Sequence, residues 1–79
     1  MKFNKINTLI NNNTELFDLS DCTEFLNDNE LKLNQFPTDS LIIFQNLTDD
    51  YNKLLSTLNT HNIQFNEYTD HIDLKYIII

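Results

Sequence analysis

The chain has 79 residues and a formal net charge of −7 at pH 7, from twelve acidic residues and five lysines. This length predicts a single domain, residues 1–79, whose small core leaves little room for a shielded catalytic cleft. The charge should repel nucleic acid and anionic membranes. No apolar stretch approaches the roughly 20 residues of a membrane-spanning helix.

Five residue types are absent, namely Gly, Ala, Val, Arg and Trp, and all of their codons carry G or C at the first or second position. This bias indicates an AT-rich genome, of the kind common in low-GC bacteria and in their phages and mobile elements. Residues 1–3 lead directly into polar sequence, without the apolar run of a signal peptide. A single cysteine, Cys22, allows no intrachain disulfide, so we expect a cytoplasmic protein.

Apolar residues at helical spacing predict a short helix within residues 2–11. The polar run of residues 11–14 should end it, because consecutive Asn side chains compete for backbone hydrogen bonds. Residues 16–19 fit either a short strand or one turn of helix. The apolar positions of the first helix are Phe3, Ile6, Leu9 and Ile10.

A second helix is predicted from about residue 20 to residues 27–29. Asp21 and Glu24 have the spacing of a capping box, in which each side chain accepts a hydrogen bond from the other residue's backbone N–H. The apolar face of this helix would consist of Cys22, Phe25 and Leu26.

Two strands are predicted in the middle of the chain. Residues 30–33 alternate between polar and apolar, which predicts a brief strand that ends before Pro37. Residues 41–44 are four consecutive apolar residues. Such a run is typical of a strand covered on both faces, because alternate side chains point to opposite sides and all of them need burial.

A third helix follows this buried strand. Thr48 is placed to cap it with its side-chain oxygen. Asp49 and Asp50 would then lie in its first turn, where the positive end of the helix dipole favours carboxylates. Asn62 suits the left-handed position just beyond the end of the helix. The core face of the helix would consist of Tyr51, Leu54, Leu55 and Leu58.

The C-terminal segments 63–68 and 71–79 predict a β-hairpin joined at residues 69–70. A two-residue loop pairs Phe65 with Leu74 and Ile63 with Tyr76, and because the type I′ turn favours glycine, a type I turn with a bulge is equally open. The inside face of the hairpin would then consist of Ile63, Phe65, Ile72, Leu74, Tyr76 and Ile78. Ile77 and Ile79 fall on the opposite face, where either the N-terminal helix covers them or they form a contact surface.

Together these segments predict an α+β fold. We expect a three- to five-stranded, mainly antiparallel sheet with two or three helices packed on it. Residues 76–79 have high β-propensity, and as an exposed edge strand they would invite pairing. A homodimer through the C-terminal strand is therefore one expectation.

No catalytic, metal or cofactor site is expected. Zinc sites usually show paired Cys or His residues at short spacing, and His61, His71 and Cys22 do not form this pattern. Cys22 falls on the apolar face of its helix, which favours a buried structural thiol over a nucleophile. A chain without glycine has no phosphate-binding glycine loop. These features argue against an enzyme.

Acidic residues dominate between residues 6 and 31, a stretch without lysine. On a helix beginning at Asp21, the carboxylates of Asp21, Glu24 and Asp28 fall on one side and form an acidic stripe. The simplest interpretation is a solvated helix face. The functional interpretation is contact with a Lys/Arg-rich surface of a partner protein. Secondary candidates for this contact are Asp18, Asp49 and Asp50, with Phe17 or Tyr68 as aromatic anchors.

Three functions are compatible with these features. The first is an inhibitor, encoded by a phage or mobile element, that blocks the basic groove of a host nucleic-acid-processing enzyme. It would act as anti-restriction and anti-CRISPR proteins do, without binding nucleic acid or membrane itself. The second is an immunity protein that neutralises a nuclease toxin through the same acidic surface. The third is a self-associating structural module.

Overall fold

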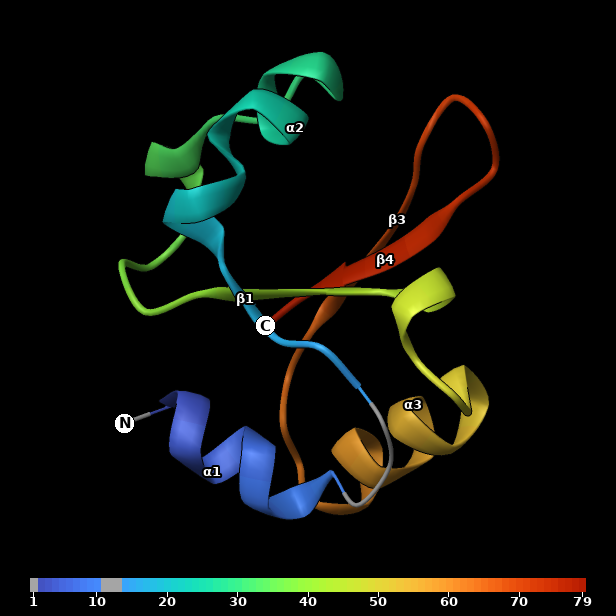
Figure 1. The fold of residues 1–79 in the computed structure, drawn as a ribbon. Helices are drawn as coiled ribbons and strands as arrows, with labels where there is room; N and C mark the ends of the chain where they lie inside the picture. The colour runs from blue at the N-terminus through green and yellow to red at the C-terminus, as the bar shows by residue number, and fades with distance from the viewer. Residues whose placement is uncertain (1, 11–13) are drawn as a thin grey trace.

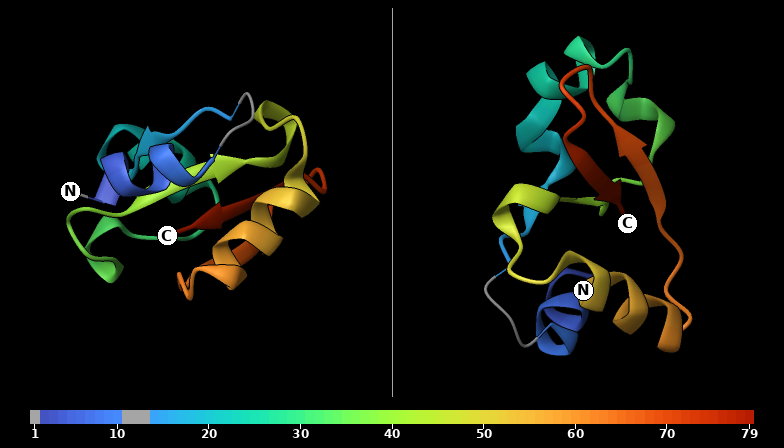
Figure 2. Two further views of the ribbon diagram at one scale, coloured as in Figure 1. Left: turned by 90° about the horizontal axis from the view of Figure 1, so that it is seen from below. Right: turned by 90° about the vertical axis from the view of Figure 1, so that its right-hand side faces the viewer.

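The computed structural model describes residues 2–10 and 14–79 and shows a four-stranded antiparallel sheet between two layers of helices (Figure 1). The strand order is β1-β2-β4-β3. The strands are β1 (Phe17–Asp18), β2 (Leu41–Phe44), β3 (Asn66–Thr69) and β4 (Lys75–Ile78). Helices α1 (Lys2–Leu9) and α3 (Tyr51–Thr60) cover one face, and α2 (Thr23–Asp28) covers the other (Figure 2). Single 3₁₀ turns form at η1 (Leu19–Cys22), η2 (Leu33–Gln35) and η3 (Gln45–Leu47). The predicted α+β class is confirmed.

Two apolar clusters, one on each face of the sheet, form the core. The cluster beneath α1 and α3 consists of Ile6, Leu41, Ile43, Tyr51, Leu54, Leu58, Ile77 and Ile79. The cluster beneath α2 consists of Leu19, Leu26, Ile42, Tyr76 and Ile78. Consecutive residues of β2 and of segment 76–79, which includes most of β4, alternate between these clusters, which explains why both segments are apolar throughout. The prediction that strand 41–44 is covered on both faces is therefore confirmed.

The N-terminal helix is present as predicted, and it packs through Ile6, which is buried. Ile10 follows the helix and packs against the same cluster. Phe3 was also predicted on the core face, but its side chain is exposed. The helix stop predicted in the Asn run falls on residues 11–13, which lie outside the described residues. None of the helices in the described segments is long and apolar enough to cross a membrane.

The N-cap of α3 is Asp50, so the prediction of Thr48 is wrong. The Asp50 Oδ1 atom accepts a hydrogen bond of 3.0 Å from the Lys53 backbone N–H. The Thr48 hydroxyl instead donates to the Phe44 carbonyl oxygen at 2.8 Å, because η3 lies between β2 and the helix. The predicted core face of α3 is confirmed by the burial of Tyr51, Leu54 and Leu58 and by the packing of Leu55.

The C-terminal end of α3 confirms the role predicted for Asn62, which is left-handed with φ 56°. Its N–H donates to the Asn59 carbonyl at 3.1 Å, and the Ile63 N–H donates to the Leu58 carbonyl at 2.9 Å. These two bonds form a Schellman motif, which satisfies carbonyls that the helix itself leaves unpaired.

The predicted register of the C-terminal hairpin is wrong, because Tyr68 rather than Ile63 lies opposite Tyr76. The loop is longer than two residues and spans residues 70–74, with the Asp70 N–H donating to the Leu74 carbonyl. The tyrosine rings stack with their centroids 5.3 Å apart. The shift places Phe65 on the face opposite to Tyr76, and Ile72 outside the core altogether.

The C-terminal strand β4 is an interior strand, hydrogen-bonded to β2 on one side and to β3 on the other. The prediction that the C-terminal strand is an exposed edge strand, on which the homodimer rested, is therefore wrong. Of the two alternatives for Ile77 and Ile79, burial is correct, since both belong to the cluster that contains Ile6 of α1.

The two segments that flank α2 differ from simple strands. Residues 16–19 contain both structures that were left open, because β1 leads directly into η1. The strand predicted at residues 30–33 is wrong. Glu30 is left-handed with φ 61°, and the Leu31 N–H donates to the Leu26 carbonyl at 2.8 Å. The start of this segment therefore ends α2 and cannot join the sheet.

Candidate protein-binding surface

The predicted acidic stripe is divided between two elements. Asp21 lies in η1, whereas Glu24 and Asp28 lie one helical turn apart on α2, and all three are exposed. Cys22, the last residue of η1, has the non-helical angles φ −117° and ψ 28°, so η1 and α2 do not form one continuous helix. The predicted capping box is also wrong, since neither η1 nor α2, both fully described, has a side-chain hydrogen bond at its N-cap.

The opposite side of α2 is held firmly on the sheet by aromatic contacts. The Phe25 ring packs edge-on against Phe44 and Tyr76, with centroid distances of 5.1 and 5.0 Å. Leu26 beside it is completely buried. Burial, and then the charge of Asp21, raise the pKa of the Cys22 thiol. This favours the protonated thiol, although the Cys22 side chain is half-buried and not buried as expected.

The turn of residues 70–74 carries a feature that the sequence interpretation missed. The Asp70 Oδ1 atom accepts hydrogen bonds from the backbone N–H groups of Ile72 and Leu74, both at 2.9 Å. Asp73 completes the turn in a left-handed conformation, with φ 63°. These constraints hold the Ile72 side chain outward, where it is 71% exposed. The signal in the sequence is the pair Asp70 and Asp73, since Asp favours turns of this kind.

Helix α2 and the β3–β4 turn lie at the same end of the molecule, at the top of Figure 1 and of the right-hand view in Figure 2. Segments 21–32 and 70–75 hold six carboxylates against two lysines. We call these two segments the acidic end. The structure thus places Glu24 and Asp28 at the same end of the molecule as carboxylates from a distant part of the chain and one exposed isoleucine.

The secondary candidates do not belong to the acidic end. Asp18 lies in the edge strand β1 and is exposed. Asp49 and Asp50 precede α3, on the opposite side of the sheet from α2 (Figure 1). The Asp50 carboxylate is also occupied as a helix cap. A single flat contact therefore does not join Asp49 and Asp50 to Glu24 and Asp28.

The two proposed aromatic anchors are half-buried rather than freely exposed. Phe17 packs edge-on against Phe44 at a centroid distance of 5.8 Å, and Tyr68 stacks on Tyr76. Both rings belong to the cluster beneath α2. Their main role is therefore to complete the core on that face.

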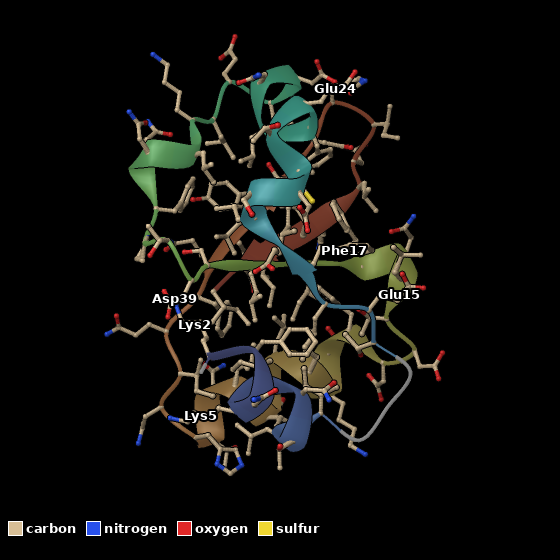
Figure 3. The ribbon with its side chains drawn as sticks, turned by 60° about the vertical axis from the view of Figure 1, so that its left-hand side comes forward. Lys2, Lys5, Glu15, Phe17, Glu24 and Asp39 are labelled. Atoms are coloured by element: carbon tan, nitrogen blue, oxygen red, sulfur yellow. The ribbon has the colours of Figure 1, made fainter. Side chains whose placement is uncertain are left out.

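Charge is distributed unevenly over the surface. Lys2 and Lys5 lie on α1, whereas Glu24 lies at the opposite end of the molecule (Figure 3). Lys2 Nζ approaches Asp39 Oδ1 at 3.4 Å and donates to the Ile79 carbonyl at 3.4 Å. In the described part of the chain, which contains all twelve acidic residues, this is the one ion pair. Among the described residues, no carboxylate of the acidic end therefore forms an ion pair with a lysine.

Within residues 2–10 and 14–79, no three His, Cys, Asp or Glu side chains are grouped to hold a metal ion. An apolar surface hollow of about 440 Å³ carries no charged side chain. It is lined by Ser20, Leu33, Asn34, Phe36, Pro37 and Thr38.

No family model matches the chain, and neither a curated protein nor a solved structure with significant similarity was found.

Proposed function

We propose that this protein is an inhibitor that binds a Lys/Arg-rich surface of a nucleic-acid-processing enzyme through its acidic end and excludes nucleic acid from it. The observation that carries the proposal is the surplus negative charge. The net charge is −7, and Asp39 is the one carboxylate in the described residues that is paired with a lysine. Unpaired surface charge attracts a basic partner over distances of about 8–10 Å at physiological salt and accelerates association.

The combination of exposed carboxylates with an exposed apolar side chain at the acidic end supports a protein as the partner. Exposed carboxylates steer an encounter, but tight complexes also need buried apolar contacts. Ile72 supplies such a contact, because the hydrogen bonds to Asp70 hold it outward before binding. A contact that is already ordered loses less conformational entropy when the complex forms.

The absence of Gly, Ala, Val, Arg and Trp, whose codons all carry G or C at the first or second position, supports a phage or mobile element of a low-GC host as the source. The alternative with the same surface is an immunity protein, whose target would be a nuclease toxin. The identity of the captured partner separates the two functions.

The experiment begins with capture of partners from a lysate of a low-GC bacterial host, at low and then moderate salt. The captured protein is purified, and its affinity is measured with and without its nucleic acid substrate. We expect mutually exclusive binding. A partner that binds this protein and its nucleic acid together would rule out occupation of the groove.

A matched pair of variants locates the contact. Glu24→Lys with Asp28→Lys alters the acidic end, and Glu15→Lys with Asp49→Lys makes the same charge change elsewhere. Each pair brings the net charge from −7 to −3. We expect the first pair to weaken binding at least about tenfold, equivalent to about 1.4 kcal/mol, and the second to have a much smaller effect. Equal losses in both would show that only net charge matters.

A further inference from the structure

Among the described residues, the outer edge of β3 has no backbone hydrogen-bond partner. This strand is the last in the sheet order and pairs with β4 alone. Apart from the β3–β4 ladder, no main-chain hydrogen bond involves residues 64–69 in the part of the chain that the structure describes. The other sheet edge, β1, is only two residues long and runs directly into η1. Of the two edge strands, β3 is therefore the longer and offers more backbone groups for pairing with a further strand.

The register of the hairpin identifies which groups face outward. In an antiparallel ladder, hydrogen-bonded and non-hydrogen-bonded pairs alternate. The Asp70 N–H donates to the Leu74 carbonyl, so the pairs formed by Tyr68 and by Asn66 are also hydrogen-bonded. The alternate residues Phe65, Glu67 and Thr69 then direct their N–H and C=O groups away from the sheet. They form a row of about 13 Å.

Side-chain amides surround the start of this edge. A surface hollow of about 490 Å³ lies beside it. Its lining residues are Asn59, Asn62, Ile63, Gln64, Phe65 and Asn66. Each amide both donates and accepts hydrogen bonds, so these side chains suit the polar backbone of an extended peptide.

We propose that an extended, lysine- or arginine-bearing segment of a protein partner adds to β3 as a fifth strand. The proposal rests on the proposed function for the basic character of the partner and adds the element by which that partner docks. Glu67 is exposed in the middle of the edge, unpaired with any lysine, and Asp70 follows the strand. A cationic side chain opposite Glu67 forms a favourable cross-strand pair.

A second copy of this chain fits the same edge poorly. Antiparallel self-pairing about the centre of the free row places Glu67 opposite its own equivalent, and like charges directly opposite destabilise a sheet. Each copy also carries a net charge of −7. Charge complementarity therefore selects a basic strand over a homodimer.

The test uses a seven-residue peptide of alternating lysine and valine as the probe, at up to millimolar concentration. Amide hydrogen exchange and NMR shifts of the full chain report where the peptide binds. We expect protection of the outward N–H groups of Phe65, Glu67 and Thr69. A peptide in which glutamate replaces lysine should protect them at least tenfold less.

The matched variants are Thr69→Pro and Thr69→Val. Proline removes an outward N–H without breaking the ladder to β4, whereas valine keeps that N–H and makes a strand of similar shape. We expect the proline variant to bind the lysine peptide at least tenfold more weakly and the valine variant to bind it as the parent does. The unchanged NMR spectrum of the remaining chain verifies that both variants are folded.

Each other outcome overturns the inference. Unprotected edge amides together with shifts at α2 would show that the peptide uses the acidic end alone, which leaves the proposed function intact. Equal protection of these edge amides by the lysine and glutamate peptides would refute a basic partner. Protection that grows with protein concentration, without peptide, would identify a second copy as the occupant. Failure of the proposed function is recognised separately, by simultaneous binding of partner and nucleic acid in the capture experiment.

Discussion

Asp49 and Asp50 are adjacent exposed residues with the same side chain, yet only Asp50 bonds the backbone of α3. The Asp50→Ala substitution removes the acceptor for the Lys53 N–H and should lower the free energy of unfolding by about 1 kcal/mol. Asp49→Ala removes an equal charge beside the same helix and should change it by less than about 0.5 kcal/mol. Urea denaturation of both variants measures the difference, and equal losses would contradict the capping assignment.

Tyr51 makes stability sensitive to alkaline pH. Burial, and then the charge of Glu67, raise the pKa of its phenol from 10.0 to about 12. Because the unfolded chain ionises first, the fold favours the neutral phenol. The contribution of the neutral phenol to the free energy of unfolding is fully present below pH 10 and is lost as the pH rises through about 12. Urea denaturation at a series of pH values should show a steeper loss in the parent than in Tyr51→Phe. Parallel profiles would be inconsistent with this assignment.

At the scale of elements, β2 supports both cores because its side chains alternate between the two faces. Ile43 is fully buried beneath α1 and α3, so Ile43→Asp places an unpaired carboxylate in the core. The cost of several kcal/mol is comparable with the total stability of about 4–12 kcal/mol expected for this length. We expect this variant to be largely unfolded by circular dichroism. Ile72→Asp, at an exposed position, is the matched control and should melt close to the parent.

At the scale of the whole molecule, unpaired negative charge opposes compaction. A net charge of −7, with one ion pair in the described residues, produces self-repulsion that salt screens. The melting temperature should therefore rise when potassium chloride is increased from low to physiological concentration. The Glu24→Lys, Asp28→Lys variant should show a smaller rise. A melting temperature that falls with salt would indicate that attractive charge pairs dominate instead.

Local patterns were sufficient where a segment is stabilised by its own sequence or by burial on both sides. The apolar run of β2, the core face of α3 and the left-handed Asn62 all follow from the spacing of neighbouring residues. Local sequence patterns were less reliable at the start of a helix, where Thr48 and Asp50 are both suitable caps. Only the position of η3 decides between them. Because η3 occupies residues 45–47, α3 begins at Tyr51 and the Thr48 hydroxyl bonds the Phe44 carbonyl.

The candidate surface was predicted only in part. Composition alone establishes the acidic character, and the spacing of Glu24 and Asp28 places them on one helix. Their association with the β3–β4 turn depends on how the hairpin packs against α2, and no short-range pattern contains that information. The exposed Ile72 was assigned to the core because a two-residue loop was assumed. The Asp70 hydrogen bonds produce a longer one.

The sequence by itself therefore determined the α+β class, the central strand and its helix, and the surplus of negative charge. Only the tertiary structure decided the hairpin register, the interior position of β4 and the grouping of carboxylates at one end. The physical reason is that these features depend on contacts between segments far apart in the chain. Burial of Ile77 and Ile79 against the cluster beneath α1 and α3, and stacking of Tyr68 on Tyr76, select one register.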